Sequence, residues 1–414
     1  MKAVARSTPS QQGRTWGLAL SVLAVSASTA VSVIYIPQAL LTAMATSFGA
    51  PAIATASVAT AVQIGYACGI FLFVPLADRV HPRRQVSVQS LRLAATLMCC
   101  AAMPSIIGLA ASFFAAGLVA NIAQVLIPAV STLAPEGKAA TATGTMVGAL
   151  LLGVFGGRIV SSVLSDSIGW RFVVLLFAGM VLATVPFTRR ALDVAWMPSA
   201  PSAKYRALLS DTLRLATRSP ELIESAVLQF LVFAVFNMFW TVSVLHLTAE
   251  PYGWSILQVG MFGFVGLSAA LVTPLFGPAI ERFGPVPVIG VALVVLLCAC
   301  ISAFFDAYVL VGLALTMFVV TLVNQAVRTS NQSRVLAANE NSAARANTLF
   351  MVGVFMGGSV GAVIAPVAYE LGGMTPVAAS ASLLVTVGIG AWGVVRARQN
   401  RRGQSHRESV CLVQ

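Results

Sequence analysis

The sequence Val74-Pro75-Leu76-Ala77-Asp78-Arg79-Val80-His81 returns in altered form as Gly277-Pro278-Ala279-Ile280-Glu281-Arg282-Phe283-Gly284. Asp78 and Glu281 lie 203 positions apart in a chain of 414 residues, and each charged turn stands between two long apolar runs. A charged turn that occurs once in each half of a hydrophobic chain predicts two homologous helical bundles. That organisation is typical of solute transporters.

The match between the two halves extends beyond this turn. Asn121 corresponds to Asn324 at the same separation of 203 positions, and Met146-Val147-Gly148 corresponds to Met351-Val352-Gly353 at 205 positions. Single matches are weak evidence in apolar sequence, but three matches in register indicate a parallel repeat. Two such halves would rock against each other and expose a central site to each side of a membrane in turn.

The composition places the chain in a lipid bilayer. It is 58% hydrophobic and 9% charged, whereas a soluble domain has roughly 25% charged residues. The net charge of +12 is scattered between the apolar runs. Basic residues in that arrangement flank membrane spans, so we expect no nucleic-acid partner.

The sequence shows no pattern of a catalytic, metal or cofactor site. Five of the six cysteines lie within apolar runs, and there are only three histidines. We interpret the cysteines as packing residues or a free tail thiol, because they form neither a disulfide framework nor a metal-binding spacing. Since a nucleotide-binding loop and a plausible catalytic triad are also missing, we expect that the protein is not an enzyme and binds neither metal nor cofactor.

Apolar runs of the length that a bilayer requires, about 20 residues, predict about twelve spans. They are expected, to within a few residues, at 16–40, 52–76, 86–104, 108–131, 142–165, 171–188, 222–246, 256–280, 286–305, 307–330, 346–369 and 375–395. We therefore predict an all-α membrane protein with an N-terminal six-helix bundle (1–188), a cytoplasmic linker (189–221) and a C-terminal six-helix bundle with a basic cytoplasmic tail (222–414).

The basic residues predict the orientation of the spans, because cytoplasmic loops carry an excess of Lys and Arg. On one side of the membrane, Arg171 would be the only basic residue among several acids. The other side would hold the tail arginines and Lys2, Arg6, Arg14, Arg79, Arg83, Arg84, Lys138, Arg189, Arg190, Lys204, Arg206, Arg214, Arg218, Arg282, Arg328, Arg334 and Arg345. Both termini are thus predicted to be cytoplasmic, in a monomeric multi-pass protein of the cell inner membrane. Trp16 would begin a first span that is retained as a signal anchor.

Leu76-Ala77-Asp78-Arg79 and the basic pair Arg83-Arg84 resemble a signature of the major facilitator superfamily, commonly written G-x-L-A-D-R-x-G-R-R. Val74 stands in place of the first glycine, and His81-Pro82 replaces the second glycine and its neighbour. The second copy keeps both glycines, Gly277 and Gly284. The resemblance extends over essentially the whole chain, and it implies twelve helices in two pseudo-symmetric bundles of six.

The resemblance also implies a role for the acid of this turn. In the family it meets the cytoplasmic end of span eleven and helps to hold the outward-facing state, and this role would fall to Asp78. A carboxylate beside the start of a helix near Ala346 is favourable by roughly 0.3–1 kcal/mol when exposed. The alternative is an acid that only neutralises local arginines. The other expected gating residues of the two copies are Arg79, Arg83, Glu281 and Arg282.

Span five is similar to the antiporter signature G-x8-G-x3-G-P-x2-G-G of bacterial drug-efflux members. Gly144, Gly153 and Gly157 hold the spacing, Arg158 stands where the proline should be, and Ser161-Ser162 replaces the paired glycines. The three glycines are therefore expected to act in conformational gating. Span four departs further, because Phe113 stands where the exporter pattern has an arginine that is often tied to proton coupling.

Glycines at a spacing of four let membrane helices approach closely. In the family fold, spans two and eleven face each other, as do spans five and eight, and glycine-rich faces there would permit sliding. The alternative is ordinary tight packing within one half. The residues concerned are Gly65 and Gly69 in span two, Gly144, Gly148, Gly153 and Gly157 in span five, Gly353, Gly357 and Gly361 in span eleven and, at a looser spacing, Gly260, Gly263 and Gly266 in span eight.

The substrate cavity of this fold is lined mainly by spans one, four, seven and ten. Polar residues within spans are costly unless they face protein or water. The polar and aromatic residues of these four spans predict a neutral, hydrogen-bonding and aromatic cavity lining. Each polar side chain could instead form a hydrogen bond that joins two helices. The candidate substrate-binding residues are Tyr35, Asn121, Gln124, Asn237, Trp240, Asn324 and Gln325.

Arg158 is the sharpest single candidate, because an unpaired arginine within a span is costly. It could attract an anionic group of a substrate or keep the outer cavity polar. Alternatively, it could be structural, bonded to backbone carbonyls or snorkelling outward. All thirteen acids fall in loops, tails or span ends. Proton coupling would therefore have to use Glu224, Asp78 or the ionisation of the substrate.

Together these features predict a secondary transporter that exports a small organic molecule, drug-like or a metabolite, by alternating access in exchange for protons or another coupling ion. The alternatives are an importer or facilitator of a small polar or anionic metabolite, and a membrane receptor that binds a ligand without transport. The short linker 189–221 and the tail leave no room for the signalling domain that a receptor would need.

Overall fold

The computed structural model describes residues 9–193, 204–273, 276–306 and 309–411, and its regular elements there are all helices. They are α1 (Pro9–Ala39), α2 (Leu41–Phe48), α3 (Ala52–Phe73), η1 (Pro75–Asp78), α4 (Pro82–Ala102), α5 (Ile106–Val119), α6 (Ile122–Leu133), α7 (Ala139–Ile168), α8 (Trp170–Ala191), α9 (Tyr205–Arg218), α10 (Pro220–Thr248), α11 (Ile256–Met261), α12 (Gly263–Leu271), α13 (Phe276–Phe283), α14 (Pro285–Asp306), α15 (Leu310–Ala338), η3 (Glu340–Ser342), α16 (Ala343–Gly372) and α17 (Met374–Cys411). Lys2, Arg6 and part of the predicted linker, 194–203, lie outside the described residues.

Eleven helical segments in the described part of the chain are long and apolar enough to cross a membrane. The predicted third span corresponds to α4, which is helical over 21 residues but does not reach that hydropathy. Its arginines Arg83, Arg84 and Arg92 lower the mean hydropathy of the segment. The helix nevertheless packs against α5 and α8. The twelfth span therefore stays a prediction.

Local sequence accounts for where the helices begin and end. Ser105 and Ser219 accept hydrogen bonds from backbone N–H groups in the first turns of α5 and α10. These N–H groups have no partner within their own helix, so the serine side chains stabilise the two helix starts. Ser255 and Gln258 form a reciprocal capping box at α11. Gly169, with φ of 78°, lets the chain turn sharply between α7 and α8.

Two of the predicted spans are broken helices. Span four divides into α5 and α6, and span eight divides into α11, α12 and the start of α13. Asn121 lies at the first break, where its Nδ2 atom donates to the carbonyl oxygen of Leu118 at 2.7 Å. A break within a membrane needs such a partner, because no water is available there for a freed backbone group.

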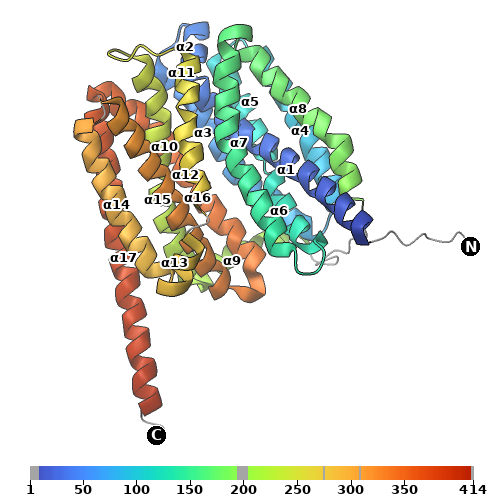
Figure 1. The fold of residues 1–414 in the computed structure, drawn as a ribbon, viewed down its shortest axis with the longest axis vertical. Helices are drawn as coiled ribbons and strands as arrows, with labels where there is room; N and C mark the ends of the chain where they lie inside the picture. The colour runs from blue at the N-terminus through green and yellow to red at the C-terminus, as the bar shows by residue number, and fades with distance from the viewer. Residues whose placement is uncertain (1–8, 194–203, 274–275, 307–308, 412–414) are drawn as a thin grey trace, which may run out of the picture.

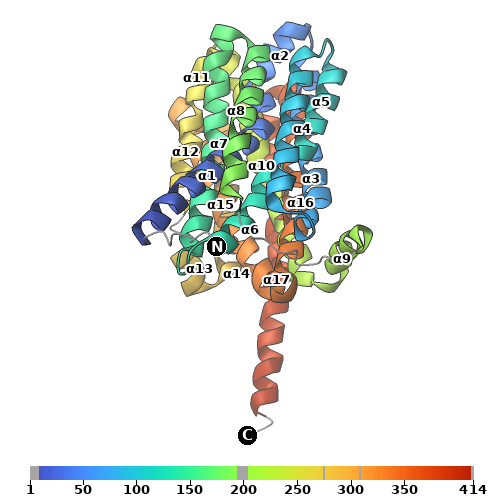
Figure 2. The same ribbon diagram turned by 90° about the vertical axis from the view of Figure 1, so that its right-hand side faces the viewer.

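The chain arranges its helices in two neighbouring groups (Figure 1), with α1–α8 on one side and α10–α17 on the other. Contacts between the groups run mainly along α3 with α16 and along α7 with α11 and α12. The amphipathic helix α9 lies at the end of the molecule where α17 projects, and Figure 2 shows it beside the main body. We call this end, where α1 begins and α17 ends, the termini side. The exact division into bundles at 188 and 222 stays a prediction.

The glycine-rich faces pack mostly against helices of their own group, which is the alternative that the sequence left open. A Cβ atom at Gly361 would lie 2.1 Å from the carbonyl oxygen of Ala234 in α10, and one at Gly153 would lie 2.4 Å from that of Ser28 in α1. Gly65 and Gly69 likewise meet α5. Some glycines do face the other group: Gly260 of α11 lies against Ser162 of α7, and Gly358 of α16 lies against Gln63 of α3.

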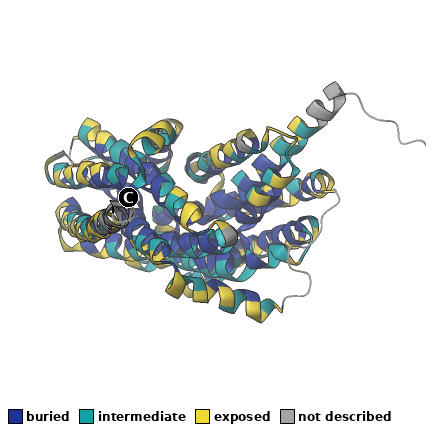
Figure 3. Ribbon diagram, turned by 90° about the horizontal axis from the view of Figure 1, so that it is seen from below, coloured by how far each residue is buried: buried dark blue, intermediate teal, exposed yellow. Residues whose placement is uncertain are grey.

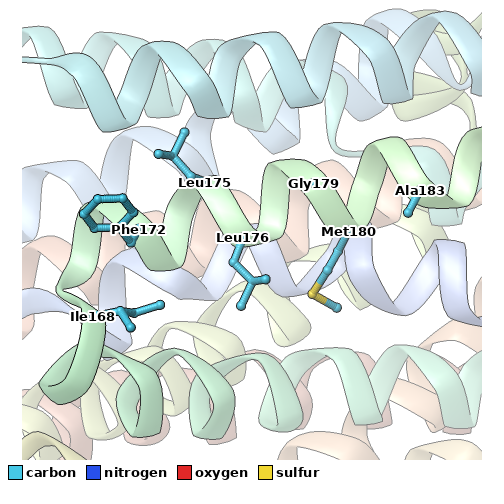
Figure 4. Close-up of a pocket in the computed structure, with 7 residues that line it drawn as sticks. All are labelled: Ile168, Phe172, Leu175, Leu176, Gly179, Met180 and Ala183. Atoms are coloured by element: carbon cyan, nitrogen blue, oxygen red, sulfur yellow. The ribbon is translucent and has the colours of Figure 1, made fainter.

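Buried residues gather between the helices, and exposed ones face outward (Figure 3). Many exposed side chains are large and apolar, as expected for a surface that lipid covers. The hollow shown in Figure 4, of ≈ 850 Å³, lies on this outer surface along α8. Its lining is wholly apolar and includes Phe172, Leu175 and Met180. It is therefore part of the lipid-facing surface and not a candidate site.

Candidate functional site

A cavity of ≈ 390 Å³ lies between the two groups of helices and toward the termini side. Its walls come from α6 and α7 on one side and from α15 and α16 on the other. Leu336, in the last turn of α15, is 37% exposed, so the cavity reaches the surface at this end. The lining residues are Gln124, Ile127, Pro128, Thr143, Val147, Leu150, Leu151, Thr273, Gln325, Arg328, Thr329, Gln332, Ser333, Leu336, Asn347 and Met351.

Helical periodicity explains both walls. Gln325, Arg328, Thr329 and Gln332 recur every three or four residues, so they share one face of α15. Thr143, Val147, Leu150 and Leu151 do the same on α7. The α15 wall is therefore polar and cationic, whereas the α7 wall is mostly apolar. A cavity of this size and mixed lining can hold a small amphipathic molecule.

Side chains close the path toward the opposite end of the molecule. The space left there is a cavity of ≈ 20 Å³, lined by Gln38, Arg158, Trp240 and others. Arg158 follows Leu151 by seven residues, which places this layer roughly 10 Å further along α7 than the lining of the large cavity. Beyond it, the backbone N–H of Leu257 in α11 donates to Oδ2 of Asp166 at 3.3 Å.

Arg158 is 5% exposed and lies among aromatic rings. Its Cζ atom is 4.7 Å from the centre of the Tyr35 ring and 4.8 Å from that of Trp240. Its Nη2 atom donates to Oε1 of Gln38, while Nη1 has no hydrogen-bond partner among the described residues. Because aromatic faces stabilise a guanidinium, they offset part of the cost of burying this charge.

Two glutamines converge on one asparagine at the same level. Nε2 of Gln38 in α1 and Nε2 of Gln63 in α3 both donate to Oδ1 of Asn237 in α10, each at 2.9 Å. Gly358 of α16 packs directly against this group, because a Cβ there would lie 2.4 Å from Oε1 of Gln63. The bonds join α1 and α3 to α10, so they tie the two groups of helices together where the path is closed.

The structure brings six of the eight predicted substrate-binding residues to this path. Gln124 and Gln325 line the large cavity, and Arg158, Tyr35, Asn237 and Trp240 form the closed layer. The other two lie elsewhere. Asn121 accepts a hydrogen bond from Nε2 of Gln89 in α4, and Asn324 accepts one from Nε2 of Gln229 in α10, both at 2.9 Å. Their amides thus join neighbouring helices within one group.

The repeated turn differs between its two copies. Asp78 is partly buried and lies close enough to Arg345, in the first turn of α16, for electrostatic attraction. Glu281 and Arg282 are exposed on α13. In the first copy, Arg79 is exposed and Arg83 forms an exposed ion pair with Asp193. Exposed pairs of this kind contribute little stability.

Sequence reasoning missed three residues of this path. Arg328 was expected on the cytoplasmic flank, but α15 continues ten residues beyond it, roughly 15 Å of helix. Gln38 and Gln63 are buried in α1 and α3. A polar amide within an apolar run is itself a signal of a partner or a path. Which partner it meets depends on helix packing, which spacing alone does not give.

Glu224, a candidate for proton coupling, has partners away from the cavity. It forms ion pairs with Arg334 of α15 and, at 2.9 Å, with Arg398 of α17. Its side chain is 16% exposed. The pairs join three helices of one group. Among the residues that line the cavity, no acid occurs.

The chain matches a model of the Major Facilitator Superfamily over residues 18–339. The protein named "Putative uncharacterized transporter YgaY" of Escherichia coli (strain K12) is 27% identical over 371 residues, covering 90% of this chain and 94% of that protein. "Probable transporter SCO4007" of Streptomyces coelicolor is 29% identical over 402 residues, covering 95% of this chain and 92% of that protein.

Solved structures share the fold at low sequence identity. A POT family transporter in complex with 5-aminolevulinic acid superposes with a TM-score of 0.72 at 13% identity, over 91% of this chain and 95% of that one. A variant of the nucleoside transporter NupG superposes with a TM-score of 0.71 at 16% identity, over 91% of this chain and 99% of that one. At these identities the likeness concerns the fold alone.

Proposed function

The chain belongs to the major facilitator superfamily and is a membrane transporter of that type, and on this premise we propose that it exports a small organic molecule in exchange for protons. Residues 1–188 and 222–414 would form two bundles of six spans that rock about the central cavity. Both termini would lie in the cytoplasm, so that the cavity faces inward in this structure.

One observation carries the proposal: the path is open at one end and closed at the other. A cavity of ≈ 390 Å³ reaches the surface on the termini side, and ≈ 20 Å³ remains at the level of Arg158. Such asymmetry is what alternating access requires of one of its two states. To pass a substrate, the bonds from Gln38 and Gln63 to Asn237 would have to break while the termini side closes.

The export direction rests on sequence similarity to drug-efflux members in span five. A screen tests it first: cells that express the protein should tolerate some toxic organic compounds better than cells that express an Asp78→Asn variant. In inverted vesicles, the compounds identified should then accumulate only while a pH gradient is applied. Loss of accumulation on collapsing the gradient is the expected result. Accumulation without a gradient would contradict proton exchange.

A facilitator is the second candidate, and a specific observation favours it. The cavity lining contains no acid, and Glu224 is paired with two arginines. A proton-coupled carrier usually has a membrane-embedded acid that titrates. If the protein is a facilitator, the compound should equilibrate across the vesicle membrane at the same rate with and without the gradient.

A further inference from the structure

Arg328 lies on the cavity wall without an acid to balance its charge. Its guanidinium contacts Sδ of Met351 at 3.7 Å, and none of the ion pairs in the described residues includes it. Arg334, six residues later in the same helix, pairs with Glu224. The two arginines of α15 thus differ: one is neutralised by protein and the other faces the cavity.

The second arginine of the path, Arg158, likewise forms no ion pair with an acid among the described residues. Arg158 is bonded to the neutral amide of Gln38 and surrounded by rings. Tyr35 lies within electrostatic reach of both Arg158 and Arg328. Two cations and no carboxylate along one buried path create a positive potential. In a medium of low polarity, that potential strongly favours an anion over a neutral or cationic molecule.

The rest of the lining limits the shape of the anion. Gln325, Thr329 and Gln332 surround Arg328 on α15 with hydrogen-bonding groups. Leu150 and Leu151 face them from α7. A ligand that matches both walls has one charged end and an apolar body. The volume of ≈ 390 Å³ is near the lower end for small-molecule sites, so the body is small.

We propose that the cavity binds small organic monocarboxylates, with Arg328 holding the carboxylate and the α7 wall holding the apolar body. A guanidinium binds a carboxylate through two parallel hydrogen bonds, which combine charge and geometry. Carboxylate binding would supply the charge that the protein does not. This inference rests on the proposed transport function for its cavity, and it names the class of substrate.

The test uses the purified full-length protein and four probes: benzoate, hexanoate and their neutral amides, benzamide and hexanamide. Thermal unfolding is followed at increasing probe concentration L, because a ligand that binds the folded state stabilises it by RT ln(1 + L/Kd) and so raises Tm. Both carboxylates should raise Tm, and neither amide should. In Arg328→Gln the apparent Kd for the carboxylates should rise by about tenfold or more, with a smaller rise in Arg328→Lys.

Arg92→Gln is the matched control, since Arg92 is an exposed arginine within α4 and does not line the cavity. It should bind the carboxylates as the unaltered protein does. The proposal is overturned if carboxylates shift Tm no more than their amides in the unaltered protein. It is also overturned if Arg328→Gln binds them with unchanged Kd. The first comparison needs no variant, so it holds even if Arg328→Gln does not fold.

The carboxylate-binding proposal and the proposed export can fail independently of each other. If benzoate binds through Arg328 but no compound is exported against a pH gradient, the substrate class stands and proton-driven export fails. If neutral or cationic compounds are exported and Arg328→Gln exports them unchanged, export stands and the carboxylate site fails.

Discussion

Gln38 donates a hydrogen bond from Nε2 to Oδ1 of Asn237 at 2.9 Å, and this bond ties α1 to α10. The Oε1 atom of the same amide accepts a bond from Arg158 of α7. One neutral side chain therefore orients a buried cation and also joins the two groups of helices at the closed end of the path. Opening that end requires these bonds to be exchanged for others.

Replacing Gln38 by Leu should favour the state that is open opposite the termini. The substitution leaves Arg158 and Asn237 without their bonds, at a cost of about 1–3 kcal/mol to the closed state. Ser243 lines the small cavity, so Ser243→Cys in a cysteine-free chain reports its accessibility. A membrane-impermeant maleimide added from the side opposite the termini should react about fivefold faster, or more.

The control for that variant is Gln332→Leu, which alters the other end of the path. It should not accelerate labelling at position 243. Equal labelling rates in Gln38→Leu and the unaltered chain would mean that the Gln38 amide does not hold the path closed.

Gly361→Val should destabilise the protein strongly. The added Cβ would lie 2.1 Å from the carbonyl oxygen of Ala234, a backbone atom that cannot move aside cheaply. Overpacking of this kind costs typically about 1–3 kcal/mol, and occasionally more. Thermal unfolding of the purified protein should show a Tm several degrees lower. Gly148→Ala, where nothing lies within 4 Å of the new Cβ, should leave Tm unchanged. If Gly361→Val kept its Tm, this face of α16 would be a loose, sliding surface.

The two copies of the repeated turn should differ in their sensitivity. Asp78→Asn removes a charge that lies near Arg345 of α16, so we expect transport to fall by at least about tenfold, with Tm little changed. Glu281→Gln removes an exposed charge on α13, and transport should remain near its normal rate. Uptake into inverted vesicles measures both. Equal losses in the two variants would show that the turn acts through its sequence alone and not through its position against α16.

Glu224→Gln should reduce stability and leave the pH dependence of transport as it is. Its carboxylate is paired with Arg334 and Arg398 and does not line the cavity. Removing one partner of a partly buried pair costs about 1–3 kcal/mol. A lower Tm with an unchanged pH profile is the expected result. A variant that transports without responding to the pH gradient would instead identify Glu224 as the coupling acid.

Hydropathy predicted the membrane-spanning helices well, because the length of an apolar run can be read directly from the sequence. Eleven of the expected spans have the length and composition to cross a membrane within the described residues. Arg158, which the sequence singled out within an apolar run, is buried in the structure. At α4 the expected helix is present, but the segment carries three arginines and does not reach the hydropathy of the other spans.

The partners of individual side chains could not be predicted in the same way. Glycine spacing predicts close packing, but it does not say whether Gly361 meets α10 or a helix of the other group. Arg328 resembled a flanking charge because the apolar run ends near it, whereas α15 continues to Ala338. Both cases depend on how helices are placed against each other, and that information comes from tertiary packing.

The most direct test of the account measures two distances in one protein by spin labelling. One pair of labels at Lys138 and Glu340 reports the termini side, and another pair at Ser167 and Leu257 reports the opposite end; all four positions are exposed. When a transported compound is added, the first distance should shorten in the same fraction of molecules in which the second lengthens. Distances that stay fixed, or that change in the same direction, would contradict a transporter whose central cavity opens to one side at a time.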